Sequence, residues 1–411
     1  MKYQKTIFNR VDVRMLTEKF GSPLYVYDEA TLRQRCREMK NLIKYPHFQV
    51  NYSAKANTNT ALLSIIREEG LHVDAMTPGE MFLEMKAGFP PDCITFIGNN
   101  VSAADFRFAR EHGIYISVDS LSQLKTLGEC WPGGDVSLRI NTGVGAGHHE
   151  KVITGGDGAK FGIVPEDIPE ALRIADEFGL KVTGVNHHIG SQFMDTDDYV
   201  FGASRLLELA KQIPALEIVD IGGGFGIPYE RAFPERLNLQ ELGDKLDVLL
   251  EEWTAQTGKE ITLRIEPGRY IVAECGVILG EVTAVKKNHG IWFVGCNVGF
   301  NTLIRPAMYD SYHEIGIVPQ EERPYAEYTE PVYLVGPICE SGDKLTHDRL
   351  LPICREGDGV IVYDAGAYGF TMASNYNSQP LPAEVLLCES GEIRLIRRAQ
   401  TLEDLWQTQC L

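Results

Sequence analysis

Short apolar runs alternate with longer amphipathic segments from about residue 30 to about residue 275. The runs predict strands over residues 48–52, 94–97, 115–118, 136–140, 182–185, 216–219 and 261–265. Between them, segments such as residues 60–69, 165–178 and 200–212 carry apolar residues at helical spacing. This repeating strand–helix order is typical of either a (β/α)8 barrel or a doubly wound parallel sheet.

The pattern changes after about residue 280, where β-branched and aromatic runs become short and turn residues separate them. These runs predict strands over residues 332–335, 359–363, 383–387 and 393–396. A second, all-β domain is therefore expected in the C-terminal part of the chain.

Length and hydropathy limit the class of protein. The 411 residues suggest two structural units or one large barrel with an attachment, and 44% hydrophobic with 23% charged residues is ordinary for a soluble chain. No apolar run approaches the roughly 20 residues that cross a bilayer. The first residues do not resemble a secretory signal, so we expect a cytoplasmic protein.

Charge and cysteine content exclude further classes. The net charge of −18 argues against nucleic acids and membranes as partners, because phosphate groups are bound by surplus Lys and Arg. An anionic small substrate would need a local basic site. The nine cysteines form no C-x-x-C pair and no Cys/His cluster at zinc spacing, so we expect free thiols and no metal.

Polar features follow several of the predicted strands, where the catalytic residues of a barrel lie. Lys55 comes directly after the first strand, although a lone lysine there would more often be a solvated turn residue. Residues 222–224 are three glycines whose N–H groups could approach a phosphate, or which form only a tight turn. A dinucleotide-binding fingerprint is excluded, because Ile227 replaces a required glycine and Pro228 follows where a helix is needed.

Two more features follow strands. Glu266 and Arg269 could supply a carboxylate and a cation to one ligand, or they could form a simple surface ion pair. His187 and His188 precede Ser191, and adjacent strand residues point to opposite faces, so at most one imidazole faces a site. Together these strand-end features favour one shared ligand.

In their order and spacing, these motifs resemble the barrel-type pyridoxal-phosphate decarboxylases, the family of ornithine, arginine and diaminopimelate decarboxylases that shares its barrel with alanine racemase. The resemblance runs from residues 21–27 to residues 401–406. It implies a (β/α)8 barrel over residues 29–278. Residues 1–28 and 279–411 would form a β-sandwich or β-barrel domain that completes the active site. It also implies pyridoxal 5'-phosphate as the cofactor and a homodimer with shared active sites.

The resemblance implies a role for each motif. Lys55 would hold the cofactor as a Schiff base, His188 would stack on its ring, and Glu266 would face the ring nitrogen, since a nearby carboxylate favours the protonated ring. That ring is the electron sink that amino-acid decarboxylation needs. The remaining cofactor contacts would be Ser191, Gly224, Gly268 and Arg269 at the phosphate, Asp74 in a supporting place within a motif that also holds Glu80, and Tyr368 at both cofactor and substrate.

Motifs at residues 304–309, 336–341, 366–369 and 372–378 resemble the diaminopimelate decarboxylases in particular. They imply that Arg269, Arg305 and Tyr309 grip a distal carboxylate and that Glu340 takes the distal ammonium. Cys339 would return a proton to the carbanion, and residues 339 and 340 would reach the active site of a partner subunit. Lysine or ornithine would leave the arginines without a carboxylate, which costs roughly 1–3 kcal/mol, so the set predicts decarboxylation of meso-diaminopimelate to L-lysine, the last step of lysine biosynthesis.

Some features leave alternatives open. Residues 296–302 lack the acidic residues that the family often has there, and residues 143–151 form a glycine-rich loop that is either a mobile lid or an ordinary flexible loop. Cys339 alone would more often be a small buried residue, and the tyrosines could belong to the core of the β-domain. A sister decarboxylase with another amino-acid substrate, a non-catalytic pyridoxal-phosphate-binding protein, and racemisation as a side activity also stay open.

Overall fold

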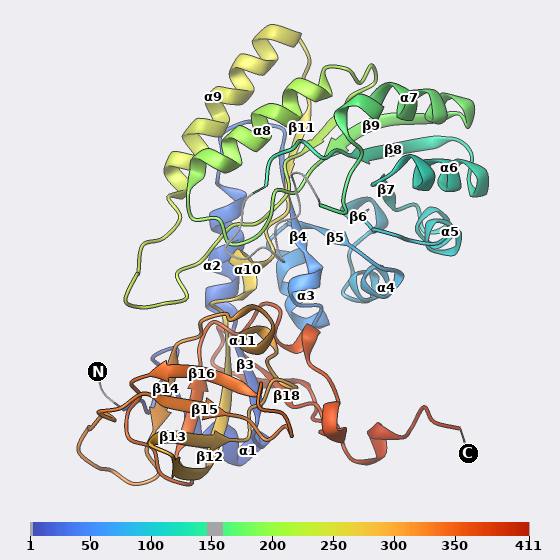
Figure 1. Cartoon of the computed structure of the whole chain (residues 1–411). Helices are drawn as coiled ribbons and strands as arrows, with labels where there is room; N and C mark the ends of the chain where they lie inside the picture. The colour runs from blue at the N-terminus through green and yellow to red at the C-terminus, as the bar shows by residue number, and fades with distance from the viewer. Residues whose placement is uncertain (1–2, 146–158, 411) are drawn as a thin grey trace. The chain divides into compact units, whose positions relative to one another are not determined.

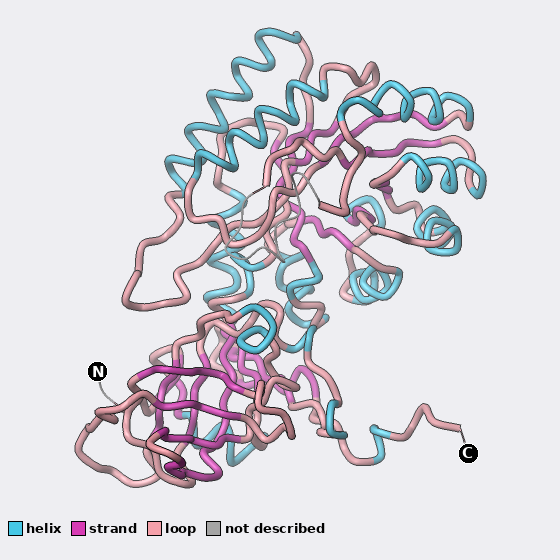
Figure 2. Tube along the Cα trace, viewed as in Figure 1, coloured by secondary structure: helices cyan, strands magenta, loops and turns pink. Residues whose placement is uncertain are grey.

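The computed structural model describes residues 3–145 and 159–410. The chain divides into two compact units. The barrel unit comprises Arg33–Ile227 and Arg236–Ile271, and the β unit comprises Met1–Leu32, Pro228–Glu235 and Val272–Leu411. Figure 2 shows helices alternating with strands in the barrel unit and strands dominating the β unit. Within the described ranges, no helix is long and apolar enough to cross a membrane.

Eight parallel strands close into a barrel in the order β10-β11-β4-β5-β6-β7-β8-β9 (Figure 1). This closure confirms the predicted barrel and excludes a doubly wound sheet. The strands are β4 (Phe48–Ser53), β5 (His72–Ala75), β6 (Ile94–Phe96), β7 (Tyr115–Val118), β8 (Gly134–Arg139), β9 (Leu180–Asn186), β10 (Ile218–Asp220) and β11 (Thr262–Ile265). The α-helices along this part of the chain are α2 (Glu29–Lys40), α3 (Thr60–Glu68), α4 (Pro78–Lys86), α5 (Ala103–Glu111), α6 (Leu121–Cys130), α7 (Ile168–Glu177), α8 (Thr196–Ala210), α9 (Leu239–Thr257) and α10 (Arg269–Val272).

The interior of the barrel is polar. Arg264 on β11 donates to Thr95 on β6 at 3.2 Å, and these two strands are not neighbours, so the contact crosses the interior. Ser117 on β7 donates to Asn186 on β9 at 2.6 Å, past the intervening β8. This explains why the sequence pattern missed β5: its inward positions are polar, which leaves only Val73 and Ala75 as an apolar signal.

The β unit contains a nine-stranded sheet in which β3 pairs with β12 and β18. Its strands and helices are β1 (Thr6–Ile7), β2 (Val11–Asp12), α1 (Val13–Phe20), β3 (Leu24–Asp28), β12 (Gly276–Asn288), β13 (Ile291–Cys296), α11 (Arg305–Tyr309), β14 (Ile315–Val318), β15 (Val332–Val335), β16 (Lys344–Arg349), β17 (Gly359–Val362), β18 (Ala383–Leu387) and β19 (Ile393–Arg397). Asp12 caps α1 by accepting from the N–H groups of Arg14 and Met15 at 2.9 and 3.1 Å. Buried residues of α1, including Leu16, join Leu24, Val277 and Val385 in one core, so the N-terminal segment is part of this unit.

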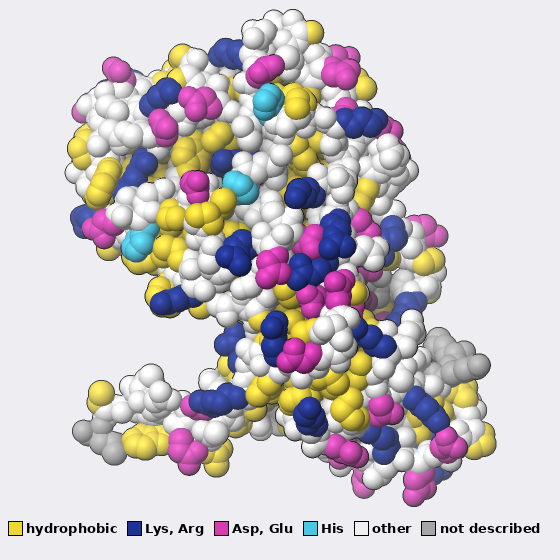
Figure 3. Space-filling view, turned by 180° about the vertical axis from the view of Figure 1, so that it is seen from behind, with side chains coloured by type: hydrophobic (Ala, Val, Ile, Leu, Met, Phe, Trp, Pro, Cys, Tyr) yellow, Lys and Arg dark blue, Asp and Glu magenta, His cyan; other side chains and the backbone are white. Residues whose placement is uncertain are grey.

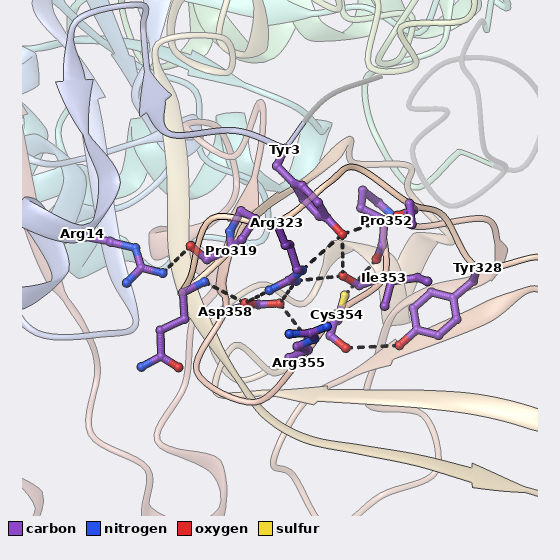
Figure 4. Close-up of polar contacts among 12 residues, drawn as sticks. Tyr3, Arg14, Pro319, Arg323, Tyr328, Pro352, Ile353, Cys354, Arg355 and Asp358 are labelled. Atoms are coloured by element: carbon purple, nitrogen blue, oxygen red, sulfur yellow. Dashed lines mark hydrogen bonds and ion pairs between the residues drawn. The ribbon is translucent and has the colours of Figure 1, made fainter.

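Polar contacts connect Tyr3, near the N-terminus, to residues that lie between the C-terminal strands (Figure 4). The Tyr3 hydroxyl donates to the carbonyl of Ile353 at 3.1 Å, and the guanidinium of Arg323 lies 4.9 Å from the Tyr3 ring centroid. Arg323 also forms a two-bonded ion pair with Asp358, whose side chain is fully buried. Segments more than 300 residues apart thus form one structural unit.

Acidic and basic side chains are interspersed over the face drawn in Figure 3. The net charge of −18 is therefore not gathered into one patch on that face.

Candidate active site

Lys55 lies in the barrel unit at the carboxyl end of β4, in the short 3-10 helix η1 (Ala54–Ala56). It is half-buried, so it is not the solvated turn lysine that the sequence left open. Burial raises the pKa values of Asp74 and Glu80, and the positive charge of Lys55 opposes this rise. The amine of Lys55 therefore lies near the carboxyl groups of Asp74 and Glu80.

Asp74 is the penultimate residue of β5 and is fully buried. Burial raises its pKa to about 8, against the opposing effects of Lys55 and of a 3.1 Å hydrogen bond from Ser53. Glu80 lies in the first turn of α4 and accepts from the Met76 N–H at 2.6 Å. Both carboxyl groups thus act electrostatically on Lys55 and are favoured by it in their charged form.

The three glycines after β10 form a turn that side chains could not enter. Gly222 and Gly224 have φ angles of +72° and +106°, and a Cβ on Gly223 would lie 1.9 Å from the Glu266 carbonyl oxygen. The Gly223 N–H donates to Nδ1 of His188 at 3.2 Å. His188 therefore lies against the glycine turn, where burial, Lys55 and Arg139 hold its pKa far below the usual range.

His187 has a different partner, since its Nδ1 lies 3.3 Å from the hydroxyl of Thr142. Burial and the charge of Arg139 lower the pKa of His187 to about 3. Both imidazoles are consequently neutral near pH 7, and that of His188 accepts a hydrogen bond from the glycine turn.

Glu266 follows β11 and is 5% exposed, which excludes a simple surface ion pair. One of its interactions is a side-chain hydrogen bond with Asp220 at the end of the neighbouring β10. Burial and Asp220 raise the pKa of Glu266 well above its usual range, so the two carboxyl groups share a proton. Among the described residues, no group hydrogen-bonds to Oε1 of Glu266, which is buried.

Ser191 and Arg269 meet near the glycine turn. Arg269 is 6% exposed and donates to the Ser191 hydroxyl at 2.9 Å. Gly268, the residue before Arg269, packs closely against the end of β4, because a Cβ there would lie 3.0 Å from Cβ of Ser53. A cation, a hydroxyl and a glycine turn together are suited to an anionic phosphate.

Sequence reasoning missed Arg139, which ends β8 and is 7% exposed. Its guanidinium lies 4.4 Å from the ring centroid of Phe161. Burial lowers the pKa of Arg139, whereas Glu266, Asp119, Asp220 and Asp74 raise it. A charged residue at the end of a predicted strand was the signal that could have identified it.

Within the β unit, Cys339 and Glu340 are both exposed, which excludes the buried small residue that Cys339 alone suggested. Asn377 binds Cys339 twice: its Oδ1 accepts from the Cys339 N–H at 3.0 Å and its Nδ2 donates to Sγ at 3.2 Å. Tyr376 donates to Glu340 and stacks on Phe300, with the ring centroids 5.7 Å apart. Phe300 belongs to the segment 296–302 that departs from the family pattern, so this departure lies beside the Glu340 cluster.

The other predicted residues of the β unit are Arg305, Tyr309 and Tyr368. Arg305 begins α11 and is 2% exposed, and Tyr309 ends this helix half-buried. Tyr368 has a φ of +55°, a conformation that costs a bulky aromatic residue energy and that clusters at functional sites. Residues 146–151 of the predicted glycine-rich loop lie outside the described residues.

A parallel barrel that carries an amine, a proton-sharing carboxyl pair and a phosphate-sized turn at its strand ends defines an enzyme built around a phosphorylated cofactor. Residues 29–273 match the family described as pyridoxal-dependent decarboxylase, pyridoxal binding domain. The chain belongs to this family, which confirms the predicted enzyme class and its cofactor, pyridoxal phosphate.

The chain is similar to diaminopimelate decarboxylases over nearly its whole length. The protein of Methanothermobacter thermautotrophicus is 41% identical over 407 residues, which cover 97% of this chain and 94% of that protein. The structure of the Helicobacter pylori diaminopimelate decarboxylase complexed with L-lysine has a TM-score of 0.88 at 32% identity and covers 96% of this chain and 98% of that one. A Vibrio vulnificus lysine/ornithine decarboxylase complexed with putrescine shares the fold, with a TM-score of 0.76 at 24% identity and coverage of 92% and 98%.

The residues of the barrel unit fit pyridoxal phosphate. Its aldehyde requires an amine, its phosphate requires a turn with N–H donors and a cation, and its protonated ring nitrogen requires a carboxylate. The half-buried amine of Lys55, the turn with Arg269, and the buried oxygen of Glu266 meet these requirements within one unit.

Proposed function

We propose that this chain decarboxylates meso-diaminopimelate to L-lysine and CO2. The observation that carries the proposal is the 41% identity to a diaminopimelate decarboxylase along 97% of the chain. The L-lysine bound in the similar Helicobacter pylori structure is the expected product of this reaction.

The barrel unit holds the cofactor in this proposal. Lys55 binds it covalently through Nζ, His188 stacks on its ring, and Asp74 supports Lys55 from β5. Ser191, Gly224, Gly268 and Arg269 hold the phosphate. The 2.9 Å bond between Arg269 and Ser191 supports this assignment, because it brings a cation and a hydroxyl to one place.

Glu266 and Asp220 control the charge at the ring nitrogen. Burial and Asp220 favour the protonated form of Glu266 before the cofactor binds, and its carboxyl group would ionise beside the protonated ring nitrogen, which Oε1 of Glu266 would face. The chemistry supplied by the bound cofactor is an electron sink for the electrons that remain on Cα when CO2 leaves. A carboxylate at this position keeps that sink protonated.

The distal end of the substrate is recognised by Arg269, Arg305 and Tyr309 at its carboxylate and by Glu340 at its ammonium. Tyr376 donates to Glu340, which holds the carboxyl group in place. Tyr368 contacts the cofactor and the substrate, and its strained backbone supports a functional place.

Cys339 returns a proton from Sγ to Cα after CO2 has left. Its exposure allows water to restore this proton, and Asn377 holds the thiol in place through two hydrogen bonds. We assign Cys339 and Glu340 to the active site of the partner subunit in a homodimer. The exposure of both residues on the single chain supports this assignment.

CO2 release from meso-diaminopimelate, L-lysine, L-ornithine and L-arginine, measured side by side, tests the substrate. Turnover of meso-diaminopimelate alone is expected, and a preference for any of the other three would refute the proposal. Mixing Lys55→Ala subunits with Cys339→Ala subunits tests the shared site. A random mixture restores about a quarter of the wild-type activity if each site uses both subunits, and none if it does not.

A further inference from the structure

Arg305 and His313 form a buried pair within the β unit. They are 2% and 0% exposed, and Nη1 of Arg305 lies 2.8 Å from Nε2 of His313. The guanidinium also lies 4.7 Å from the ring centroid of Tyr229, and the Tyr229 and His313 ring centroids are 5.3 Å apart. Arg305 thus contacts both an imidazole nitrogen and an aromatic face, which fixes the direction of a long side chain.

The partners of His313 determine its tautomer. A guanidinium has only donors, so Nε2 of His313 must accept from Arg305 and carries no proton. Nδ1 lies 2.8 Å from the carbonyl oxygen of Tyr363, which only accepts, so Nδ1 carries the proton. His313 is therefore a neutral imidazole that connects the backbone after β17 to the guanidinium on α11.

We propose that His313 is a positioning residue that aims Arg305 at the distal carboxylate of the substrate. The inference rests on the proposed function for the role of Arg305, whereas the arrangement of the pair is given by its hydrogen bonds. The guanidinium is planar and rigid. The bond between Nη1 and His313 therefore also fixes the directions of the other N–H groups of Arg305. Without this acceptor, the side chain of Arg305 would be more mobile before the substrate binds. Binding would then cost the conformational entropy of ordering it.

A matched pair of variants separates positioning from a structural role. In His313→Gln, Oε1 replaces the Nε2 acceptor and the contact with Arg305 is kept. In His313→Asn, the shorter side chain keeps the contact with the Tyr363 carbonyl and loses Arg305. We expect Asn to raise KM for meso-diaminopimelate on the order of 10-fold with kcat little changed, and Gln to restore KM.

The same variants made in an Arg305→Met background complete the test. If His313 acts through Arg305, His313→Asn has no further effect on KM once the guanidinium is gone. The proposal would be overturned if His313→Asn still raised KM in that background. It would also be overturned if His313→Asn behaved like wild type and His313→Gln did not.

A measurement without substrate separates this inference from the proposed function. The ¹⁵N chemical shifts of His313 in the cofactor-loaded enzyme report its tautomer, and we expect the neutral Nδ1–H form. A proton on Nε2 would overturn the inference even in an active decarboxylase. If the enzyme does not turn over meso-diaminopimelate, the proposed function fails, and the shifts still decide whether His313 accepts from Arg305.

Discussion

Glu84 is a buried acidic residue whose carboxyl group has no hydrogen-bond partner among the described residues. It lies on α4, three residues after Met81, so helical spacing places it on the same buried face. It is 0% exposed, and neither carboxyl oxygen has a hydrogen-bond partner among residues 3–145 and 159–410. Burial, with a further contribution from Asp74 and Glu80, raises its pKa to about 9. Glu84 is therefore protonated in the folded protein at pH 7.

The cost of this arrangement depends on pH. The unfolded chain releases the proton of Glu84 near pH 4.5, whereas the folded chain keeps it up to about pH 9. Stability is therefore unaffected by Glu84 below pH 4.5 and falls as pH rises between these values. Each pH unit costs about 1.4 kcal/mol, so the penalty at pH 7 is on the order of 3 kcal/mol.

Glu84→Gln removes this titration and keeps the volume of the side chain. We expect the variant to be more stable than wild type at pH 7, with a gap that widens by about 3 kcal/mol between pH 5 and pH 7. Guanidinium unfolding of both cofactor-loaded proteins, followed by circular dichroism, measures the gap. Glu111→Gln on the exposed end of α5 is the matched control, since it makes the same substitution at a site that is not buried. A gap that does not change with pH, or a less stable Glu84→Gln, would refute the reasoning.

Three further predictions follow from the site and from α11. Gly223→Ala would place a Cβ 1.9 Å from the Glu266 carbonyl, so we expect loss of bound cofactor, measured by its visible absorbance. Cys339→Ala should keep that absorbance and lose activity on the order of 100-fold, because the proton donor is gone; unchanged turnover would contradict this role. His347 donates to Asp310 at 2.9 Å, and this bond raises its pKa. Its stabilising contribution should be complete below pH 6.5 and vanish as pH rises through the raised pKa, so the stability gap between wild type and His347→Gln should close at alkaline pH.

Each of these three has a control. Gly79→Ala, whose Cβ would lie 3.6 Å from the Thr77 hydroxyl, should bind cofactor normally. Cys410→Ala changes an exposed thiol outside the site and should keep full turnover. His289→Gln, also exposed, should show no pH-dependent gap. If a control variant shows the same change as its test variant, the effect is not specific to the site.

Much of this protein is determined locally by its sequence. Seven barrel strands, the glycine turn at residues 222–224 and the strand-end positions of Lys55 and Glu266 follow from short patterns of apolar, glycine and polar residues. These patterns suffice because each reports the local structure of its own segment: short apolar runs in buried strands, period 3.6 in helices, and positive φ at glycine.

Other features exist only once the barrel closes. The strand β5 is too polar to be found from a pattern of apolar residues, because its inward side chains face a polar interior that only the tertiary structure creates. Asp220 and Glu266 come to share a proton because β10 and β11 are neighbours, although 46 residues separate the two in the chain. The burial that raises the pKa of Glu84 and the pairing of Arg305 with His313 are likewise decided by packing. Burial and non-local pairing depend on the closed fold, so no local pattern in the sequence contains them.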